Sequence, residues 1–545
     1  MATRSELSGA QDQRLLDAQV GRAASESPAA WWVGMAFLCV ELGVPLLAVR
    51  VPPLTDYPNH LARCYVLAFG AGDPVLSRMF SAHWQIIPNI AIDLILPALM
   101  HVFSPFTAGR IVLGLCLLVP VSGAIALSYA YFGQRSFWQM TAGFAGFNAL
   151  FLMGFMNFAI AIGIALWGAA AWIHYRERKP LLAIASGALI GTIVFFFHMM
   201  GFCFYALLVG CYELIAIADG VRTRGGLLLG VKRASVAAIP FLVPAGLYLL
   251  SPLDKLGSAP LWAGVSVKMW SLLVPFLDYS VVFDLIVIAP VAACLIYCLL
   301  RRKISVSRPG LLAIAILIVA YVLLPVRMKG VWWVDTRMVA MLGFLVFAVF
   351  LPRGLTQRQQ NVFAVLFGIF LLAKTVFITG VWIDSQRDVD DVRQVIAQVE
   401  PGRRVLDVDV TQEDDPAWYA AMPIGRRIPH LNPTYWHLAS VVLLDRHAFW
   451  PSIFAIDTQQ PIRVQEPYTA TLGRGAAPPD YKLLGSSNFS ANDAERYPFL
   501  ADWDHTFDYV LMLNAEGAGN LDQILPEKLQ LLDHRGIAAL FRIRK

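Results

Sequence analysis

Apolar runs of about 20 residues recur along most of this chain, and they constrain its fold more than any other feature. One such run spans the ~30 Å hydrocarbon core of a bilayer as a helix. The expected spans cover residues 31–51, 86–104, 108–131, 152–174, 181–199, 200–219, 231–250, 281–300, 309–325, 337–352 and 361–383. Only 15% of the 545 residues are charged, against about 25% in a soluble domain. We therefore expect an α-helical polytopic membrane protein with about 11 transmembrane helices.

The stretch from Phe137 to Tyr175 allows two interpretations, either one span preceded by a partly inserted helix or two short spans. The distribution of positive charge decides between them. Lys and Arg gather in the connectors 174–180, 219–233, 300–308 and 352–360, which are expected to be cytoplasmic. This orientation needs an odd number of crossings between Phe137 and Tyr175, so we favour one span plus a re-entrant or interfacial piece.

The same orientation assigns the remaining parts of the chain. Residues 1–30 form a cytoplasmic tail, and residues 31–383 form the transmembrane domain, whose first outer loop is 52–85. Residues 384–545 alternate short apolar strands with polar stretches. Strands are expected at 404–408, 509–513 and 537–542, with a helix at Leu521–Asp533. This order predicts a small extracytoplasmic α/β domain with a partly parallel sheet.

A polar cluster opens the first outer loop. Asp56, His60 and Arg63 are spaced i, i+4, i+7 and would share one face of a helix. Ionisable groups inside spans cost roughly 2.5–3.5 kcal/mol each, so they tend to be functional or paired. Acids and bases gather on the same outer side, which indicates an extracytoplasmic site between helices. The candidate substrate-binding residues are His60, Arg63, Asp93, Asn157, His198, Arg327, Lys329, Asp335 and Arg337.

Each candidate also has a purely structural interpretation. Asp56 precedes Tyr57-Pro58 and could only cap a helix. Asp93 could serve helix packing, and Asn157 could cross-link helices. Arg337 could pair with Asp335 alone. These alternatives stay open at the level of sequence.

The layout resembles the GT-C glycosyltransferase superfamily, specifically an uncharacterised bacterial branch. The similarity rests on the first span, on the acid in Thr55-Asp56-Tyr57-Pro58, on the many-span body and on the outer domain after the last span. Further similar motifs are Pro88–Leu94, Gly154–Phe158, His198–Phe202 and Asp335–Met338. The resemblance implies a multi-pass protein of the bacterial inner membrane with a periplasmic C-terminal domain. It also implies a polyprenyl-phosphate-sugar donor, a lipid or glycan acceptor, and Asp56 as general base.

The residues themselves suggest how the transfer of a hexose or pentose would work. One base and one displacement predict inversion at the anomeric carbon, and Arg337 is the first candidate to hold the phosphate because a guanidinium can bind two of its oxygens. Tyr57 rather than a second acid follows Asp56, so we name no metal ligands, and a divalent cation is the one cofactor left open. Membrane lipids are expected partners and nucleic acid is not. The alternatives are a transporter or flippase of a lipid-linked or small substrate, and a polymerase or ligase of lipid-linked glycans.

Overall fold

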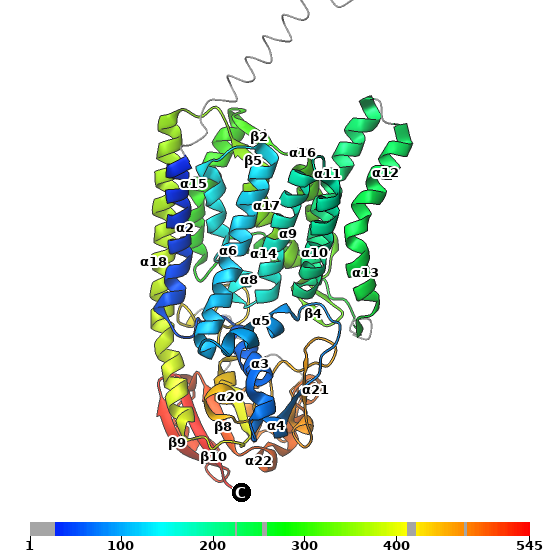
Figure 1. Cartoon of the computed structure of the whole chain (residues 1–545). Helices are drawn as coiled ribbons and strands as arrows, with labels where there is room; N and C mark the ends of the chain where they lie inside the picture. Colours follow the sequence, from blue (N-terminus) through cyan, green and yellow to red (C-terminus); the bar gives the residue numbers. More distant parts are fainter. Residues whose placement is uncertain (1–27, 224–225, 253–258, 411–420, 474–476) are drawn as a thin grey trace, which may run out of the picture.

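A long bundle of helices carries a small C-terminal domain at one end, which we call the domain end (Figure 1). The computed structural model describes residues 28–223, 226–252, 259–410, 421–473 and 477–545, so the predicted tail lies outside it apart from residues 28–30. Within these ranges eight helical segments are long and apolar enough to cross a membrane. They are α2 (Pro28–Ala48), α6 (Pro105–Phe132), α9 (Met156–Tyr175), α10 (Pro180–Phe197), α11 (Met199–Thr223), α12 with α13 (Gly226–Ala238 and Leu242–Leu249), α15 (Val281–Leu300) and α18 (Gln357–Val395). The expected polytopic helical fold is confirmed.

The predicted span at 86–104 is wrong. Helix α5 covers only Ala91–Met100, and ten residues rise about 15 Å, half the thickness of a hydrocarbon core. Asn89 takes a positive φ of 76° just before this helix. The backbone N–H of Ile90 then donates to the carbonyl of Phe196, the last helical residue but one of α10. The segment therefore stays at the domain end.

A broken segment passes through the bundle where a re-entrant piece was expected. It consists of α7 (Phe137–Met140), a 3-10 turn η2 (Thr141–Ala145) and α8 (Ala149–Leu152). It runs beside α2 in the same direction, since Gly143 lies against Leu38 and Gly146 against Leu42. Beyond the end of α2, the carbonyl of Leu152 accepts from the N–H of Thr55. The segment 137–155 therefore runs beside most of α2 and does not turn back as the expected re-entrant piece would.

Of two shorter helices, α17 (Val334–Val349) packs inside the bundle, and α16 (Arg308–Leu323) lies against it with its opposite face exposed. Helix α17 is buried along most of its length, although its first turn carries Asp335 and Arg337. Helices α6 and α9 are in close backbone contact at Gly123, where an added Cβ would lie 2.6 Å from the carbonyl oxygen of Gly163. Small residues permit such backbone contact between membrane helices.

The C-terminal domain contains a four-stranded sheet in the order β6-β8-β10-β9. Its strands are β6 (Val405–Asp409), β8 (Tyr509–Leu513), β9 (Leu529–Arg535) and β10 (Ala538–Ile543). Strands β6 and β8 are parallel and the other pairs are antiparallel, as a partly parallel sheet requires. The predicted helix at Leu521–Asp533 is wrong, because a short 3-10 turn (Leu521–Gln523) and strand β9 occupy this stretch. Pro526 interrupts any helix there.

The first outer loop is built into the C-terminal domain. Helix α3 (Tyr57–Phe69) and α4 (Leu76–Met79) lie among its strands and turns (Figure 1), and β1 (Phe80–Ala82) pairs with β7 (Ile462–Val464). Asn59 donates to the carbonyl of Ser452 and accepts from the N–H of Phe454, both at 2.9 Å. Helix α18 continues from the bundle into the domain, so the predicted boundary after residue 383 falls within one helix. The first loop is therefore held between the bundle and the domain.

Candidate active site between the helical bundle and the C-terminal domain

Asp56 stands at the start of α3 with its carboxylate unused by the helix. It is the N-cap residue by position, yet its side chain makes no capping hydrogen bond. Pro58 in the first turn supplies a helical φ and has no N–H to satisfy. The side chain is 18% exposed, whereas its neighbours Thr55 and Tyr57 are fully buried. Capping alone therefore does not explain the residue.

The turn after α8 sets the position of Asp56. Its backbone N–H donates to the carbonyl of Met153 at 3.1 Å. Gly154 follows with a φ of +83°, and an added Cβ there would lie 3.0 Å from the Cβ of Asp56 and 2.9 Å from the backbone nitrogen of Tyr57. Only glycine can adopt this positive φ and also allow such close approach of the Asp56–Tyr57 backbone without strain. The broken crossing thus ends in a turn shaped around the backbone of Asp56.

His437 of the C-terminal domain lies against the Asp56 carboxylate. Its Nδ1 is 3.1 Å from Oδ1 of Asp56, and the imidazole is only 1% exposed. The two atoms are in close contact without meeting hydrogen-bond geometry. The loop that precedes His437 also touches the site, since the Thr55 hydroxyl donates to the carbonyl of Pro433 at 3.3 Å.

His60 lies one turn further along α3, as the predicted spacing requires. Its ring meets the ring of Phe454 edge to face at a centroid distance of 5.3 Å, and Phe454 contacts His437 on another side at 4.9 Å. Burial lowers the pKa of His60 well below its usual range, and the charges of Arg63 and His437 lower it further. His60 is therefore a neutral imidazole beside Asp56.

Arg337 approaches the same turn from α17. Its guanidinium lies over the rings of Phe155 and Phe158, at 4.7 and 5.7 Å from their centroids. Its Nη1 donates to the carbonyl of Trp332 at 2.7 Å, while its buried Nε has no hydrogen-bond partner among the described residues. It interacts electrostatically with both Asp56 and His198. Asp56 packs against Gly154, and Arg337 lies over Phe155 and Phe158. An acid and a cation therefore contact the same turn, residues 154–158.

His198 belongs to this neighbourhood as well. Its ring meets Phe158 edge to face at 5.2 Å, and its Nδ1 accepts the N–H of Met200 where α10 passes into α11. Asp56 and His198 therefore both lie near Arg337, and His60 follows Asp56 by one turn of α3.

Arg63 and Asp93 use their charges on each other. The Nε of Arg63 donates to Oδ1 of Asp93 at 2.7 Å, and both side chains are almost completely buried. Asn157 ties the start of α9 to the segment before α5, since it accepts from the N–H of Ile92 and donates to the carbonyl of Asn89. These contacts support the structural interpretation of the three residues: they hold α3, α5 and α9 together around the site.

The candidates before α17 divide into two groups. Asp335 does not pair with Arg337, because its Oδ2 lies 3.2 Å from Nζ of Lys268 and its Oδ1 accepts from Thr336. Arg327 lies over the ring of Trp332 at 5.1 Å, and its buried Nε has no partner within the described ranges. Lys329 is exposed at the tip of the hairpin that joins β3 (Arg327–Met328) to β4 (Val331–Trp332). Arg327 is therefore the second cation near Arg337, through their shared contact with Trp332.

Comparison with solved structures identifies the architecture. ArnT from Cupriavidus metallidurans, crystallised with undecaprenyl phosphate, superposes with a TM-score of 0.53 at 11% identity, over 95% of this chain and 98% of that one. Its apo structure gives the same score and coverage at 12% identity. The chain has the fold of ArnT.

Other comparisons add little to the fold assignment. The Archaeoglobus fulgidus oligosaccharyltransferase in complex with zinc and sulfate matches 88% of this chain and 68% of its own, at 12% identity and a TM-score of 0.40. No family model and no curated protein matches the sequence. The resemblance expected from the sequence is thus confirmed at the level of the fold.

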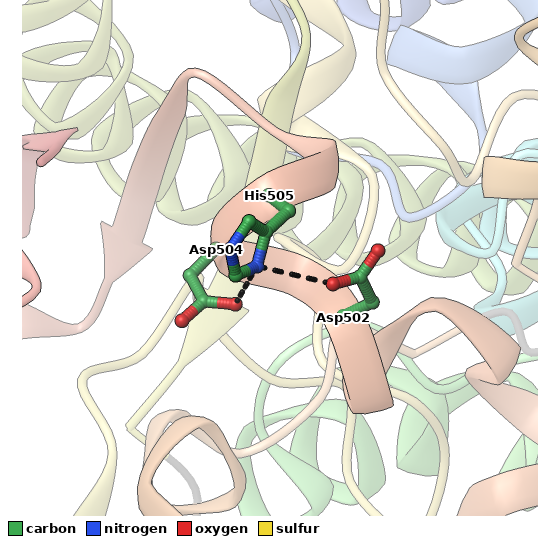
Figure 2. Close-up of side chains that lie close together, drawn as sticks. All are labelled: Asp502, Asp504 and His505. Atoms are coloured by element: carbon green, nitrogen blue, oxygen red, sulfur yellow. Dashed lines mark hydrogen bonds and ion pairs between the residues drawn. The ribbon is translucent and has the colours of Figure 1, made fainter. Parts of the chain in front are cut away.

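One group of side chains in the C-terminal domain has the composition of a metal site. Asp502, Asp504 and His505 place their ligand atoms within 4.8 Å of one another (Figure 2). The cluster is largely exposed, and the ammonium of Lys528 lies 2.6 Å from Asp504. It belongs to α22 (Trp503–Thr506), at the end of the domain away from the bundle (Figure 1). This cluster is separate from Asp56, so it offers no ligands to the candidate active site of the GT-C fold.

Sequence reasoning missed the contact between His437 and Asp56. His437 ends the segment Ile428–His437, a loop of the C-terminal domain that mixes aromatic and hydrogen-bonding residues. No local pattern links it to Asp56, because the two residues meet through tertiary structure alone. The available signal was general: a histidine in an aromatic loop of the outer domain.

Proposed function

We propose that this protein is an inverting glycosyltransferase that moves a hexose or pentose from a polyprenyl-phosphate donor to a hydroxyl acceptor. The observation that carries the proposal is the pair of opposite charges around one turn: Asp56 packs against Gly154, and Arg337 lies over Phe155 and Phe158. The GT-C fold supports it, because ArnT with the same fold binds undecaprenyl phosphate.

Asp56 acts as the general base in this proposal. Its carboxylate takes the proton from the acceptor hydroxyl as the hydroxyl oxygen attacks the anomeric carbon. The bond from that carbon to the phosphate oxygen breaks, and its electron pair leaves with the phosphate. Attack opposite to the leaving group inverts the configuration. General base catalysis of this kind contributes typically about 10²–10⁴-fold.

Arg337 binds the departing phosphate. A buried guanidinium without full hydrogen bonding is costly, and phosphate oxygens can accept from its free Nε. This interaction becomes stronger as negative charge develops on the leaving phosphate. The phenylalanine rings under Arg337 exclude water while they tolerate the cation. Arg327, on the other side of Trp332, supplies a second positive charge.

The reaction takes place on the outer side of the bacterial inner membrane. The basic connectors lie at the end of the bundle opposite to the C-terminal domain, since the loop 300–308 follows α15 and the loop 174–180 follows α9. Positive loops remain in the cytoplasm. The domain end, with Asp56, then faces the periplasm, where lipid-linked sugars and their acceptors are present.

An activity test of Asp56 checks the proposal. A deletion strain should accumulate the unused lipid-linked donor, which mass spectrometry of its lipid extract identifies. With that extract as substrate, purified Asp56→Asn protein should transfer sugar at least about a hundredfold more slowly than wild type. It should still bind undecaprenyl phosphate, because the phosphate contacts come from Arg337.

The matched control is Asp457→Asn, which removes an exposed acid of the same outer domain that pairs only with Arg463 in a surface ion pair. This variant should keep the wild-type rate. Full activity of Asp56→Asn would refute the assignment of the base. Movement of a lipid-linked substrate across vesicles by wild type, without a new glycoconjugate, would instead indicate a flippase.

A further inference from the structure

We propose that His437 of the C-terminal domain is the positioning residue of the Asp56 base. In this inference, which rests on the proposed function, the Nδ1–H of His437 donates to Oδ1 of Asp56 and turns the other carboxylate oxygen toward the acceptor. The C-terminal domain would then complete the active site rather than only hold an acceptor.

The imidazole is held in place by aromatic rings on two sides. Its centroid lies 4.9 Å from that of Phe454 at an interplanar angle of 79°, and 6.0 Å from that of Trp450 at 75°. With 1% of its side chain exposed, His437 has little room to leave the carboxylate. Donation requires the N–H to turn toward Oδ1, and such catalytic contacts often tighten only when substrate is bound.

The backbone around His437 is fastened to the first loop on both sides of Asp56. Before His437, the carbonyl of Pro433 accepts from the hydroxyl of Thr55. After it, Ser452 and Phe454 make two hydrogen bonds to Asn59. The distance between His437 and Asp56 is therefore set by several contacts that do not involve either side chain.

Fixing one carboxylate oxygen has a chemical consequence. A general base must meet its proton within hydrogen-bond reach, and a misplacement of about 1 Å costs on the order of a hundredfold in rate. A free aspartate beside the cationic Arg337 would turn toward that guanidinium and away from the acceptor. The imidazole offers a competing donor on the side of the C-terminal domain.

Other titratable groups face this pair from three elements. They are Arg337 from α17, His60 from α3 and Asp407 from β6. Asp407 is completely buried, and burial raises its pKa to about 6. Since it interacts with the charge of His437, it lies on the imidazole's side of the pair, whereas Arg337 lies on the carboxylate's side.

Two substitutions of similar polarity separate a positioning role from simple packing. In His437→Asn the amide NH₂ takes the place of Nδ1, whereas in His437→Gln it takes the place of Nε2 and leaves Asp56 without a donor. We expect His437→Asn to keep kcat within about threefold of wild type and His437→Gln to lose roughly 10- to 100-fold, with KM for the donor unchanged in both.

The pH profile gives a readout that packing would not move. A donor on Oδ1 favours the ionised carboxylate, so its loss should shift the acid limb of the kcat profile of His437→Gln upward by about one pH unit. Thermal unfolding of both variants checks that they fold. Equal kcat values for the two variants, or an unshifted acid limb in His437→Gln, would overturn the positioning role. Inactivity of Asp56→Asn in the same assay would leave the proposed function intact, so the two failures are distinguishable.

Discussion

Replacing Gly154 by alanine tests whether the turn after α8 sets the geometry of the base. The added Cβ would lie 2.9 Å from the backbone nitrogen of Tyr57, and it must retreat to about 3.4 Å before contact becomes ordinary. Backbone atoms cannot swing aside as a side chain can, so Asp56 must move by about half an ångström relative to Phe155 and Arg337. Since a displacement of about 1 Å costs on the order of a hundredfold, we expect kcat to fall roughly tenfold or more.

The substitution also has a cost in stability that must be separated from the displacement. At a φ of +83° an alanine is less favourable than glycine by roughly 1–2 kcal/mol. Gly133→Ala is the matched control, because Gly133 has a φ of +68° and no described atom lies within 4 Å of its added Cβ. Both variants should melt at similar temperatures, while transfer kinetics with the donor identified from the deletion strain should show a loss only in Gly154→Ala. Wild-type kcat in Gly154→Ala would refute the reasoning.

Two further predictions concern buried charges. Arg63→Met should destabilise the protein by about 3–5 kcal/mol because it leaves Asp93 buried without its partner, and adding Asp93→Leu should recover most of that loss. If the double variant instead lost as much stability as the losses of the two single variants added together, this prediction would be contradicted. Burial raises the pKa of Asp409 to about 7, so folding is favoured with this acid protonated, and the resulting stability is lost as pH rises from about 4 through 7. Asp409→Asn keeps an acceptor for Asn514. It should therefore raise the free energy of unfolding at pH 8 by up to about 4 kcal/mol and leave it unchanged at pH 4. Thermal melts at the two pH values test this, and an equal effect at both would count against it.

Hydropathy predicted the helical part of the fold well where a span is one regular helix. It failed at 137–155, because a crossing broken into α7, a 3-10 turn and α8 has no helical period over its whole length. It failed at 86–104 for the opposite reason, since an apolar run can lie at the end of a bundle without crossing it. In the C-terminal domain the three predicted strands were found. The helix predicted at Leu521–Asp533 was wrong, because the pattern of polar and apolar residues around Pro526 resembles that of a helix whereas β9 begins at Leu529.

The candidate site divides in a similar way. Spacing along one helix predicted that Asp56 and His60 lie together, and charge topology predicted that Arg337 lies on the same side. Sequence could not show that Arg63 and Asp93 neutralise each other, or that Asp335 pairs with Lys268. Such partners depend on which helices become neighbours, and local periodicity carries no information on that.

A structure of the protein with undecaprenyl phosphate bound tests the central claim most directly, because the claim joins Asp56 and Arg337 in one site. We predict phosphate oxygens within about 3 Å of the Arg337 guanidinium, with the Asp56 carboxylate facing the same side of the turn at Gly154–Phe158. A phosphate bound elsewhere, with Arg337 still donating only to the carbonyl of Trp332, would contradict it.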